Sequence, residues 1–246
     1  MEVQTEKNIL ATSEESPVYA LLRRPSLIDF PGRLCRLMFI SGCNMQCIFC
    51  HNNDLIKPQK PTIKWDKLKS ILLASRGNWV NAVCISGGEP TFHPELKDLI
   101  HWLKDLGFQV KLDTNGTRPE VLAEVLPYVD YAAMDYKAPL EAYREITEKP
   151  DLDVQCITES VKLIKDWDGE YEFRTTVIDG FHREEDMLAI CREIGGGRRY
   201  VIQAYVPLQG VIPRKGLPTR RTPMELLRRF HELCKDHFKD TILRGA

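Results

Sequence analysis

Hydrophobic residues along the chain follow two alternating patterns, one typical of strands and one typical of helices. Short apolar runs, such as residues 80–88 and 199–207, are typical of buried strands. Between such runs lie segments whose apolar residues recur three and four positions apart, as Leu68, Ile71 and Leu72 do. Strand and helix patterns alternate about six times, which is typical of an α/β domain with a parallel sheet.

The pattern predicts one domain over residues 17–246, preceded by a polar and poorly ordered tail at residues 1–16. The predicted strands cover residues 34–40, 80–88, 108–116, 130–138, 170–179 and 199–207. The predicted helices cover residues 65–75, 94–107, 119–128, 140–147, 157–167, 183–195 and 222–238.

Overall composition favours an ordinary globular protein, with 43% hydrophobic and 28% charged residues. The net charge of −1 gives no general reason to expect nucleic acid or membrane binding. No run reaches the roughly 18 apolar residues that a membrane span requires, so we expect no membrane association. The N-terminal segment is acidic and lacks the apolar core of a signal peptide, so we expect a cytoplasmic protein.

Charge is uneven along the chain. Residues 198–246 hold eleven Lys or Arg against four Asp or Glu, a local charge of +7 that leaves −8 on the rest. A solvated basic face explains this asymmetry. A docking edge for an acidic partner explains it too, and would include Arg220, Arg221, Arg228 and Arg229.

Three of the eight cysteines lie within the segment SGCNMQCIFCHN, at Cys43, Cys47 and Cys50. Thiolates select zinc or iron–sulfur clusters. Structural zinc needs a fourth ligand, and His51 follows Cys50 too closely for easy tetrahedral geometry about one ion. A [4Fe–4S] cluster held by three cysteines would leave one iron open; zinc and an incidental grouping remain the alternatives. The other cysteines are predicted to be small buried hydrophobes: Cys35, Cys84, Cys156, Cys191 and Cys234.

Further polar segments follow the predicted strands, where ligands bind in parallel sheets. They are Gly87-Gly88-Glu89-Pro90, Asp113-Thr114-Asn115-Gly116 and Asp135-Tyr136-Lys137, with Gln203 late in the last strand. The glycines allow close approach to a ligand, and Glu89 offers a carboxylate to an ammonium group. Each segment alone also fits an ordinary turn, and Arg174 within a strand fits a salt bridge.

The spacing Cys-x3-Cys-x2-Cys, with Phe49 just before the last cysteine and ISGGEP at residues 85–90, resembles the radical S-adenosylmethionine enzymes. The resemblance implies an incomplete (β/α)6 barrel. It also implies one [4Fe–4S] cluster on Cys43, Cys47 and Cys50, with S-adenosylmethionine chelating the open iron. Residues 87–90 would then hold the amino group of the cofactor.

Within that superfamily, SLIDFPG, KLDTNG, MDYKAP and YEFRTTV occur in the order seen in anaerobic ribonucleoside-triphosphate reductase activating proteins. These are relatives of the pyruvate formate-lyase activating enzyme. The likeness implies a monovalent cation near Asp113 and Asp135, and His51 is expected to lie beside the cluster or to be merely structural. The full set of expected cofactor contacts is Phe49, His51, Gly87, Gly88, Glu89, Pro90, Asp113, Thr114, Asn115, Asp135, Lys137, Arg174 and Gln203.

The resemblance implies an activity in which flavodoxin or ferredoxin donates an electron and S-adenosylmethionine yields a 5′-deoxyadenosyl radical. That radical would abstract hydrogen from a glycine of a partner glycyl radical enzyme. The first alternative is a radical enzyme acting on a small molecule, a peptide or tRNA, although the balanced charge disfavours tRNA. A non-catalytic iron–sulfur electron carrier is the second, but such carriers normally close the cluster with a fourth cysteine.

Overall fold

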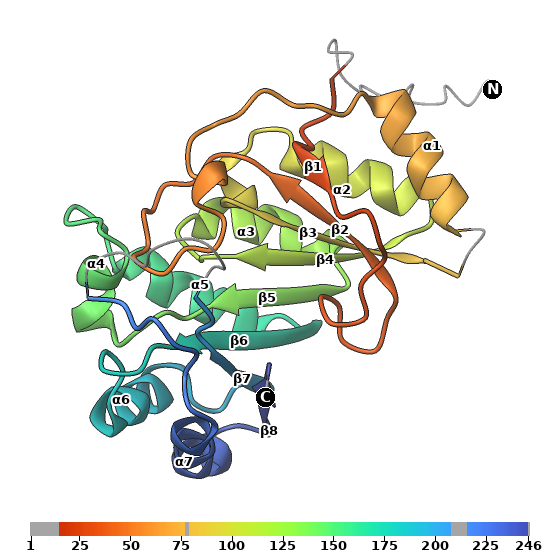
Figure 1. Cartoon of the computed structure of the whole chain (residues 1–246). Coiled ribbons are helices and arrows are strands. Elements are labelled where there is room, and N and C mark those ends of the chain that lie inside the picture. The colour runs from red at the N-terminus through yellow and green to blue at the C-terminus, as the bar shows by residue number, and fades with distance from the viewer. Residues whose placement is uncertain (1–14, 77–78, 208–215, 246) are drawn as a thin grey trace.

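The strands form one sheet in the order in which they occur along the chain (Figure 1). The computed structural model describes residues 15–76, 79–207 and 216–245. Within these residues the short strand β1 pairs antiparallel with β2, and every later pair is parallel. The strands are β1 Ala20–Leu21, β2 Cys35–Ile40, β3 Ala82–Gly87, β4 Gln109–Thr114, β5 Tyr131–Asp135, β6 Glu170–Val177, β7 Arg199–Ala204 and β8 Asp240–Arg244.

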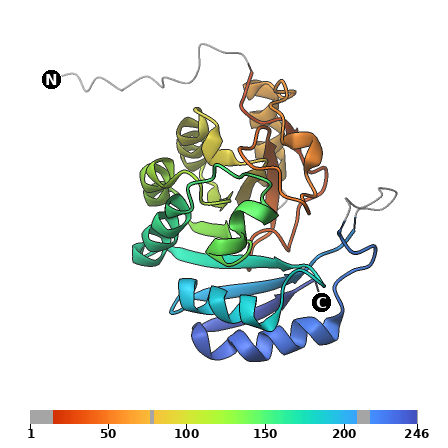
Figure 2. The ribbon, with the colours of Figure 1, turned by 90° about the vertical axis from the view of Figure 1, so that its left-hand side faces the viewer.

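Helices line one side of the curved sheet (Figure 2). They are α1 Trp65–Arg76, α2 Leu96–Asp105, α3 Pro119–Val125, α4 Tyr143–Ile146, α5 Gln155–Asp166, α6 Glu184–Ile194 and α7 Met224–Cys234. Each strand from β2 to β7 is followed by at least one helix before the next strand begins. Among the described residues no helix has the length and apolar content that a bilayer span needs.

The predicted α/β class with a parallel sheet is confirmed, and β2 to β7 with their helices form the expected (β/α)6 unit. Two strands were missed. β1 has only two residues, and β8 has charged residues at both ends instead of an apolar run. Most of the expected tail, residues 1–14, lies outside the described residues. Ser16 is described, and its hydroxyl donates to Ile63 O at 2.6 Å.

Four of the five isolated cysteines are buried as small side chains, namely Cys35, Cys84, Cys191 and Cys234. Cys156 differs, because it is only half-buried on α5 and its thiol donates to Asp153 O. These five thiols lie outside the lining of the cavity described below.

The two faces of the sheet differ in chemistry. On β4, Val110 and Leu112 point into the apolar core that also contains helix residues, whereas Lys111 and Asp113 alternate with them. The same alternation on β6 places Arg174 on the charged face. Parallel sheets are usually apolar on both faces. The charged inner face is therefore a specialised surface whose ions need partners.

One such pair connects the last strand to the middle of the sheet. Arg244 on β8 donates two hydrogen bonds to the carboxylate of Glu172 on β6, at 2.7 and 2.8 Å. The Tyr131 hydroxyl donates a third, at 2.9 Å. Glu172 is completely buried. Burial alone would raise the pKa of Glu172, but the bonds from Arg244 hold it below its usual value.

We expect Arg244→Met to lower the free energy of unfolding by about 3 kcal/mol at pH 7, because Glu172 would keep a buried charge without its hydrogen-bonded cation. The pKa of Glu172 is lower in the folded than in the unfolded chain, so its contribution is present above about pH 4 and is lost as pH falls further. The difference between variant and wild type should therefore shrink in acid.

Urea unfolding at pH 7 and at about pH 3, below the unfolded-state pKa of Glu172, measures both effects. Arg198→Met is the matched control, because Arg198 pairs with Asp168 and Glu170 at the surface. We expect that variant to lose under about 1 kcal/mol. Equal losses for the two variants would contradict the role given to the buried pair.

Candidate active site

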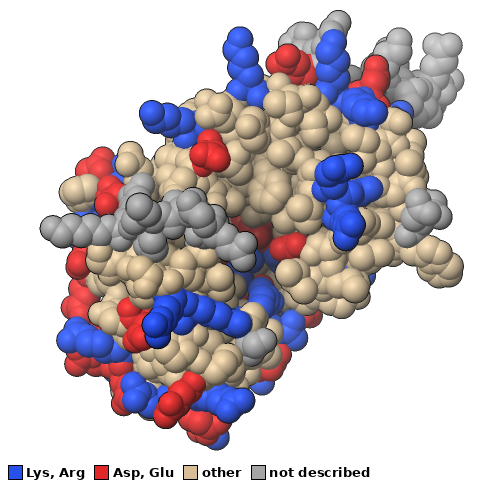
Figure 3. Space-filling view, viewed as in Figure 1, with Lys and Arg blue, Asp and Glu red and all other residues tan. Residues whose placement is uncertain are grey.

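A cavity opens where the carboxyl ends of the strands meet, and charged side chains lie within the hollow seen in Figure 3. All sixteen residues named from the sequence as cluster or cofactor ligands line it. They come from the loop after β2, the ends of β3, β4 and β5, and from β6 and β7. Residues far apart in the sequence thus meet because parallel strands end at one edge of the sheet.

The loop that carries Cys43, Cys47 and Cys50 is fixed by backbone hydrogen bonds to two different segments. Cys43 N donates to Ile56 O at 2.9 Å. Farther along, Ile48 N donates to Ile146 O at 3.1 Å, at the end of α4. Burial raises the pKa of the Cys43 thiol to about 12 and raises that of Cys47. Both thiols are therefore protonated at neutral pH unless a positively charged group binds them.

Gly87 and Gly88 bring the end of β3 against the cysteine loop. A Cβ on Gly88 would lie 2.2 Å from Gly42 O, and one on Gly87 would lie 2.1 Å from Ile40 O. Gly87 also has a φ of +131°, which side-chain-bearing residues rarely adopt. Close approach to a ligand is one reason to expect glycine at these two positions. The structure gives an additional reason, since the chain's own backbone occupies the space.

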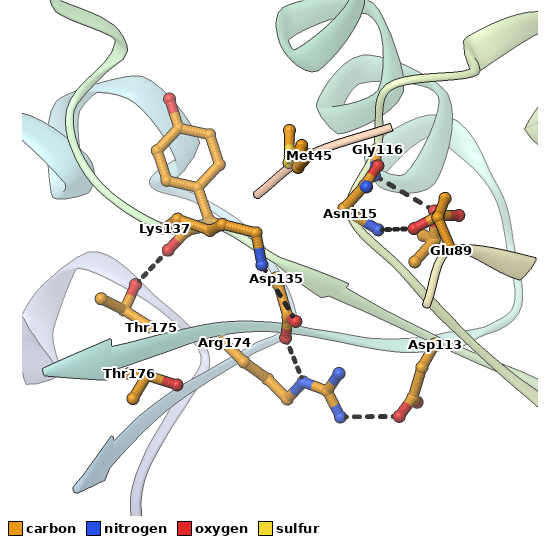
Figure 4. A network of polar contacts seen from close by, with 12 residues as sticks. Met45, Glu89, Asp113, Asn115, Gly116, Asp135, Lys137, Arg174, Thr175 and Thr176 are labelled. Carbon is orange, nitrogen blue, oxygen red and sulfur yellow. Dashed lines mark hydrogen bonds and ion pairs between the residues drawn. The ribbon is translucent and has the colours of Figure 1, made fainter. Parts of the chain in front are cut away.

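Glu89 is buried and receives hydrogen bonds from several neighbours. Its Oε1 accepts from Thr91 N at 3.1 Å and from the Thr114 hydroxyl at 2.8 Å. Oε2 accepts from Asn115 N at 2.6 Å (Figure 4). Burial raises the pKa of Glu89, whereas these bonds favour its charged form. A cation beside the carboxylate would favour that form further.

A chain of alternating charges crosses the inner face of the sheet. Arg174 Nε donates to Asp135 Oδ1 at 2.8 Å, and its Nη1 donates to Asp113 Oδ2 at 3.2 Å (Figure 4). Lys137 extends the chain to Asp135 at 3.3 Å, and the buried Lys111 binds Asp113. Burial alone would raise the pKa of Asp135, but Arg174 and Lys137 lower it to about 2.

The expected monovalent cation near Asp113 and Asp135 stays a prediction. In the structure, the positive charge between these two carboxylates is the guanidinium of Arg174. The alternative interpretation of Arg174, a salt bridge, is therefore confirmed. Arg174 also lines the cavity.

Three further predicted residues line the cavity outside this chain of salt bridges, namely His51, Gln203 and Phe49. His51 is exposed, and its Nε2 lies 2.6 Å from Val206 O, so it connects the cysteine loop to the segment after β7. Gln203 donates to the Thr176 hydroxyl at 2.7 Å. The Lys137 ammonium lies 5.7 Å from the ring centroid of Phe49.

Four lining residues were not named from the sequence: Met45, Asn52, Ser86 and Thr176. Asn52 directly follows His51, and its side-chain amide donates to Gly87 O at 2.9 Å. Thr176 is two residues after Arg174 on β6, so the period of a strand could have placed it on the same face. Ser86 lies within ISGGEP, directly before Gly87, so that segment could have indicated it, whereas Met45 carries no comparable signal.

The family model for the radical SAM superfamily matches residues 37–194. The chain belongs to the radical SAM superfamily. A solved structure of QueE from Escherichia coli has a similar fold, with a TM-score of 0.53 and 15% identity over 94% of each chain.

Among relatives of this radical SAM protein, one from Methanocaldococcus jannaschii is named a "putative glycyl-radical enzyme activating enzyme". It is 29% identical over 89% of this chain and 92% of its own length. The pyruvate formate-lyase-activating enzyme of Clostridium pasteurianum is 30% identical over 50% of this chain and 54% of its own. A 7-carboxy-7-deazaguanine synthase of Thermococcus kodakarensis is 24% identical over 72% of this chain and 77% of its own length.

Radical SAM membership implies a [4Fe–4S] cluster and S-adenosylmethionine. The donors in the cavity fit both groups, since three thiols come from one loop and a buried carboxylate lies on the adjoining wall. Within the described residues, no group of three His, Cys, Asp or Glu side chains is placed to share a single metal ion.

We expect Gly88→Ala to lower the free energy of unfolding by about 3 kcal/mol, because the new Cβ would collide with Gly42 O and Leu55 O. Gly32→Ala is the control. Gly32 has a φ of +71° but open space around it, so only about 1 kcal/mol of backbone strain is expected. Urea unfolding compares the two variants, and equal costs would contradict the steric explanation.

Proposed function

We propose that this radical SAM enzyme generates a glycyl radical on a partner enzyme, and that the partner is an anaerobic ribonucleoside-triphosphate reductase. The observation that carries the proposal is the shared cavity, in which the cysteine loop, the Glu89 loop and the charged ends of β4 and β5 all take part. The relative from Methanocaldococcus jannaschii supports the activating role, because its similarity extends over 89% of this chain.

In this proposal Cys43, Cys47 and Cys50 hold the cluster. Bound iron would take the place of the thiol protons, which burial otherwise favours on Cys43 and Cys47. The loop is already anchored at Ile56 and Ile146, so little chain ordering is needed when the cluster binds.

Glu89 would receive the ammonium group of the cofactor. Its Oε2 carries one hydrogen bond from the described residues, whereas Oε1 carries three. Thr91, Thr114 and Asn115 fix the orientation of the carboxylate, so it needs no rearrangement on binding. The other predicted contacts would surround the rest of the cofactor: Phe49, His51, Gly87, Gly88, Pro90, Asp113, Asp135, Lys137, Arg174 and Gln203.

When bound, cluster and cofactor supply reductive cleavage of S-adenosylmethionine and, through it, hydrogen-atom abstraction. The chain's own contribution is to position the cofactor and to exclude water. Lys137 and Arg174 are held by ion pairs to Asp135, so their charges are fixed before any ligand enters. Phe49 covers the Lys137 ammonium from the side of the cysteine loop.

The partner would reach the cavity from the open inner face of the sheet, whose edge strands β1 and β8 do not pair with each other. Flavodoxin or ferredoxin is the proposed electron donor. The basic residues before and on α7 offer a docking edge for an acidic protein, since Arg220, Arg221 and Arg228 are exposed. Arg229 is already paired with Glu184 at 2.9 Å.

We expect anaerobic reconstitution to load about four irons per wild-type chain, and alanine variants of Cys43, Cys47 or Cys50 to lose most of that iron. Cys156→Ala is the matched control, because Cys156 is a partly accessible thiol outside the cavity, and it should load normally. Iron and sulfide analysis makes the comparison. Full loading of the three variants would contradict the ligand assignment.

With dithionite and S-adenosylmethionine, the loaded enzyme should release 5′-deoxyadenosine, and Glu89→Gln should weaken cofactor binding by tenfold or more because an ammonium–carboxylate pair is lost. Thr91→Val serves as the control, since it removes one donor to Glu89 but keeps the charge. Unchanged affinity in Glu89→Gln would contradict the role given to Glu89.

Addition of an anaerobic ribonucleoside-triphosphate reductase should give a glycyl radical signal by electron paramagnetic resonance. Normal release of 5′-deoxyadenosine without a signal on this or any other glycyl radical enzyme would favour a small-molecule or peptide substrate. A loaded cluster that cleaves no S-adenosylmethionine would favour an electron carrier.

A further inference from the structure

Asn115 connects the two halves of the cavity. It follows β4, is nearly buried, and its backbone N–H donates to Glu89 Oε2 at 2.6 Å. Its side-chain Nδ2 faces the cysteine loop, 3.9 Å from Cys43 Sγ and 3.1 Å from Asn44 Oδ1. One residue thus contacts the carboxylate proposed to receive the cofactor and a thiol proposed to bind the cluster.

The orientation of the Asn115 amide is fixed by its neighbour Thr117. Asn115 Oδ1 accepts from the backbone N–H of Thr117 at 3.0 Å and from its hydroxyl at 2.6 Å. A backbone N–H can only donate, so the amide oxygen must face Thr117 and the amide nitrogen must face Cys43. The Thr117 hydroxyl accepts in turn from Asn44 Nδ2 at 2.8 Å, which closes a ring of three side chains.

We propose that Asn115 is a positioning residue that donates a hydrogen bond to Cys43 Sγ and thereby raises the reduction potential of the cluster. This inference rests on the proposed function, because it requires Cys43 to be a cluster ligand. A hydrogen bond to a ligating sulfur stabilises negative charge. The reduced cluster carries one more electron than the oxidised cluster, so the bond favours reduction.

The same sulfur also accepts from Met45 N at 3.5 Å. That bond belongs to the backbone of the cysteine loop and is present whichever side chain stands at position 115. The Asn115 contact is different, because it comes from the residue that follows β4. Substitution at this position removes the donor to Cys43 together with the bond to Asn44 Oδ1, so the control must disturb the same ring and keep the Cys43 donor.

The test is a redox titration of the reconstituted cluster, in which electron paramagnetic resonance measures the amount of reduced cluster. We compare wild type with Asn115→Leu, which removes the donor at similar size, and with Asn115→Asp, which is nearly isosteric but presents a carboxylate. At the wild-type midpoint, the ratio of reduced to oxidised cluster should fall about fivefold in Asn115→Leu, which is about 40 mV for a one-electron couple. It should fall further in Asn115→Asp, because a negative charge would lie beside Cys43.

Thr117→Val is the matched control. It removes a buried hydroxyl from the same ring, but the Thr117 backbone N–H still orients the Asn115 amide, so the ratio should stay within about twofold of wild type. A purely structural ring would instead shift all three variants alike, or lower their iron content without changing the potential.

Equal potentials in wild type, Asn115→Leu and Asn115→Asp, with clusters fully loaded, would overturn this inference alone. If Asn115→Leu does not load iron, the difference in potential between wild type and Asn115→Asp decides whether the inference holds. A wild-type chain that holds no cluster on the three cysteines would overturn the inference together with the proposed function.

Discussion

The close contact between the end of β3 and the start of the cysteine loop is the constraint on which the cavity depends. Gly88 N donates to Ile40 O at 2.9 Å, and Glu89 N donates to Gly42 O at 2.8 Å. Because Gly87 and Gly88 have no side chains, the end of β3 and the start of the cysteine loop can lie side by side. Main-chain hydrogen bonds therefore fix the position of the backbone that carries Glu89 relative to the start of the cysteine loop.

Ion pairs hold the charged side chains on the inner face of the sheet in place, as the backbone contact holds the Glu89 loop against the cysteine loop. Asp113, Arg174, Asp135 and Lys137 compensate one another, so the inner face can hold ions without the cost of unpaired burial. Such an arrangement stabilises the fold only weakly compared with apolar packing. Its value is a set of fixed dipoles and charges around a ligand.

Much of this arrangement could be predicted from the sequence, because strand ends in a parallel sheet converge and the chemically distinctive residues stand at those ends. Asp113 and Asp135 are examples. Lys111 and Arg244 were missed for a physical reason. A lysine in a strand or an arginine near the end of a chain usually faces solvent, and only tertiary contact shows that these two enter the interior. The ring formed by Asn44, Asn115 and Thr117 likewise depends on distances that spacing along the chain does not contain.

The pair between Arg244 and Glu172 also bears on how the chain folds during synthesis. Its partners are separated by 72 residues, and β8 is the last strand of the sheet to leave the ribosome. Until then Glu172 lacks its cation, and closing so long a loop is entropically costly. We therefore expect the apolar layer between sheet and helices to form first, and the charged interior to be completed only when residue 244 emerges.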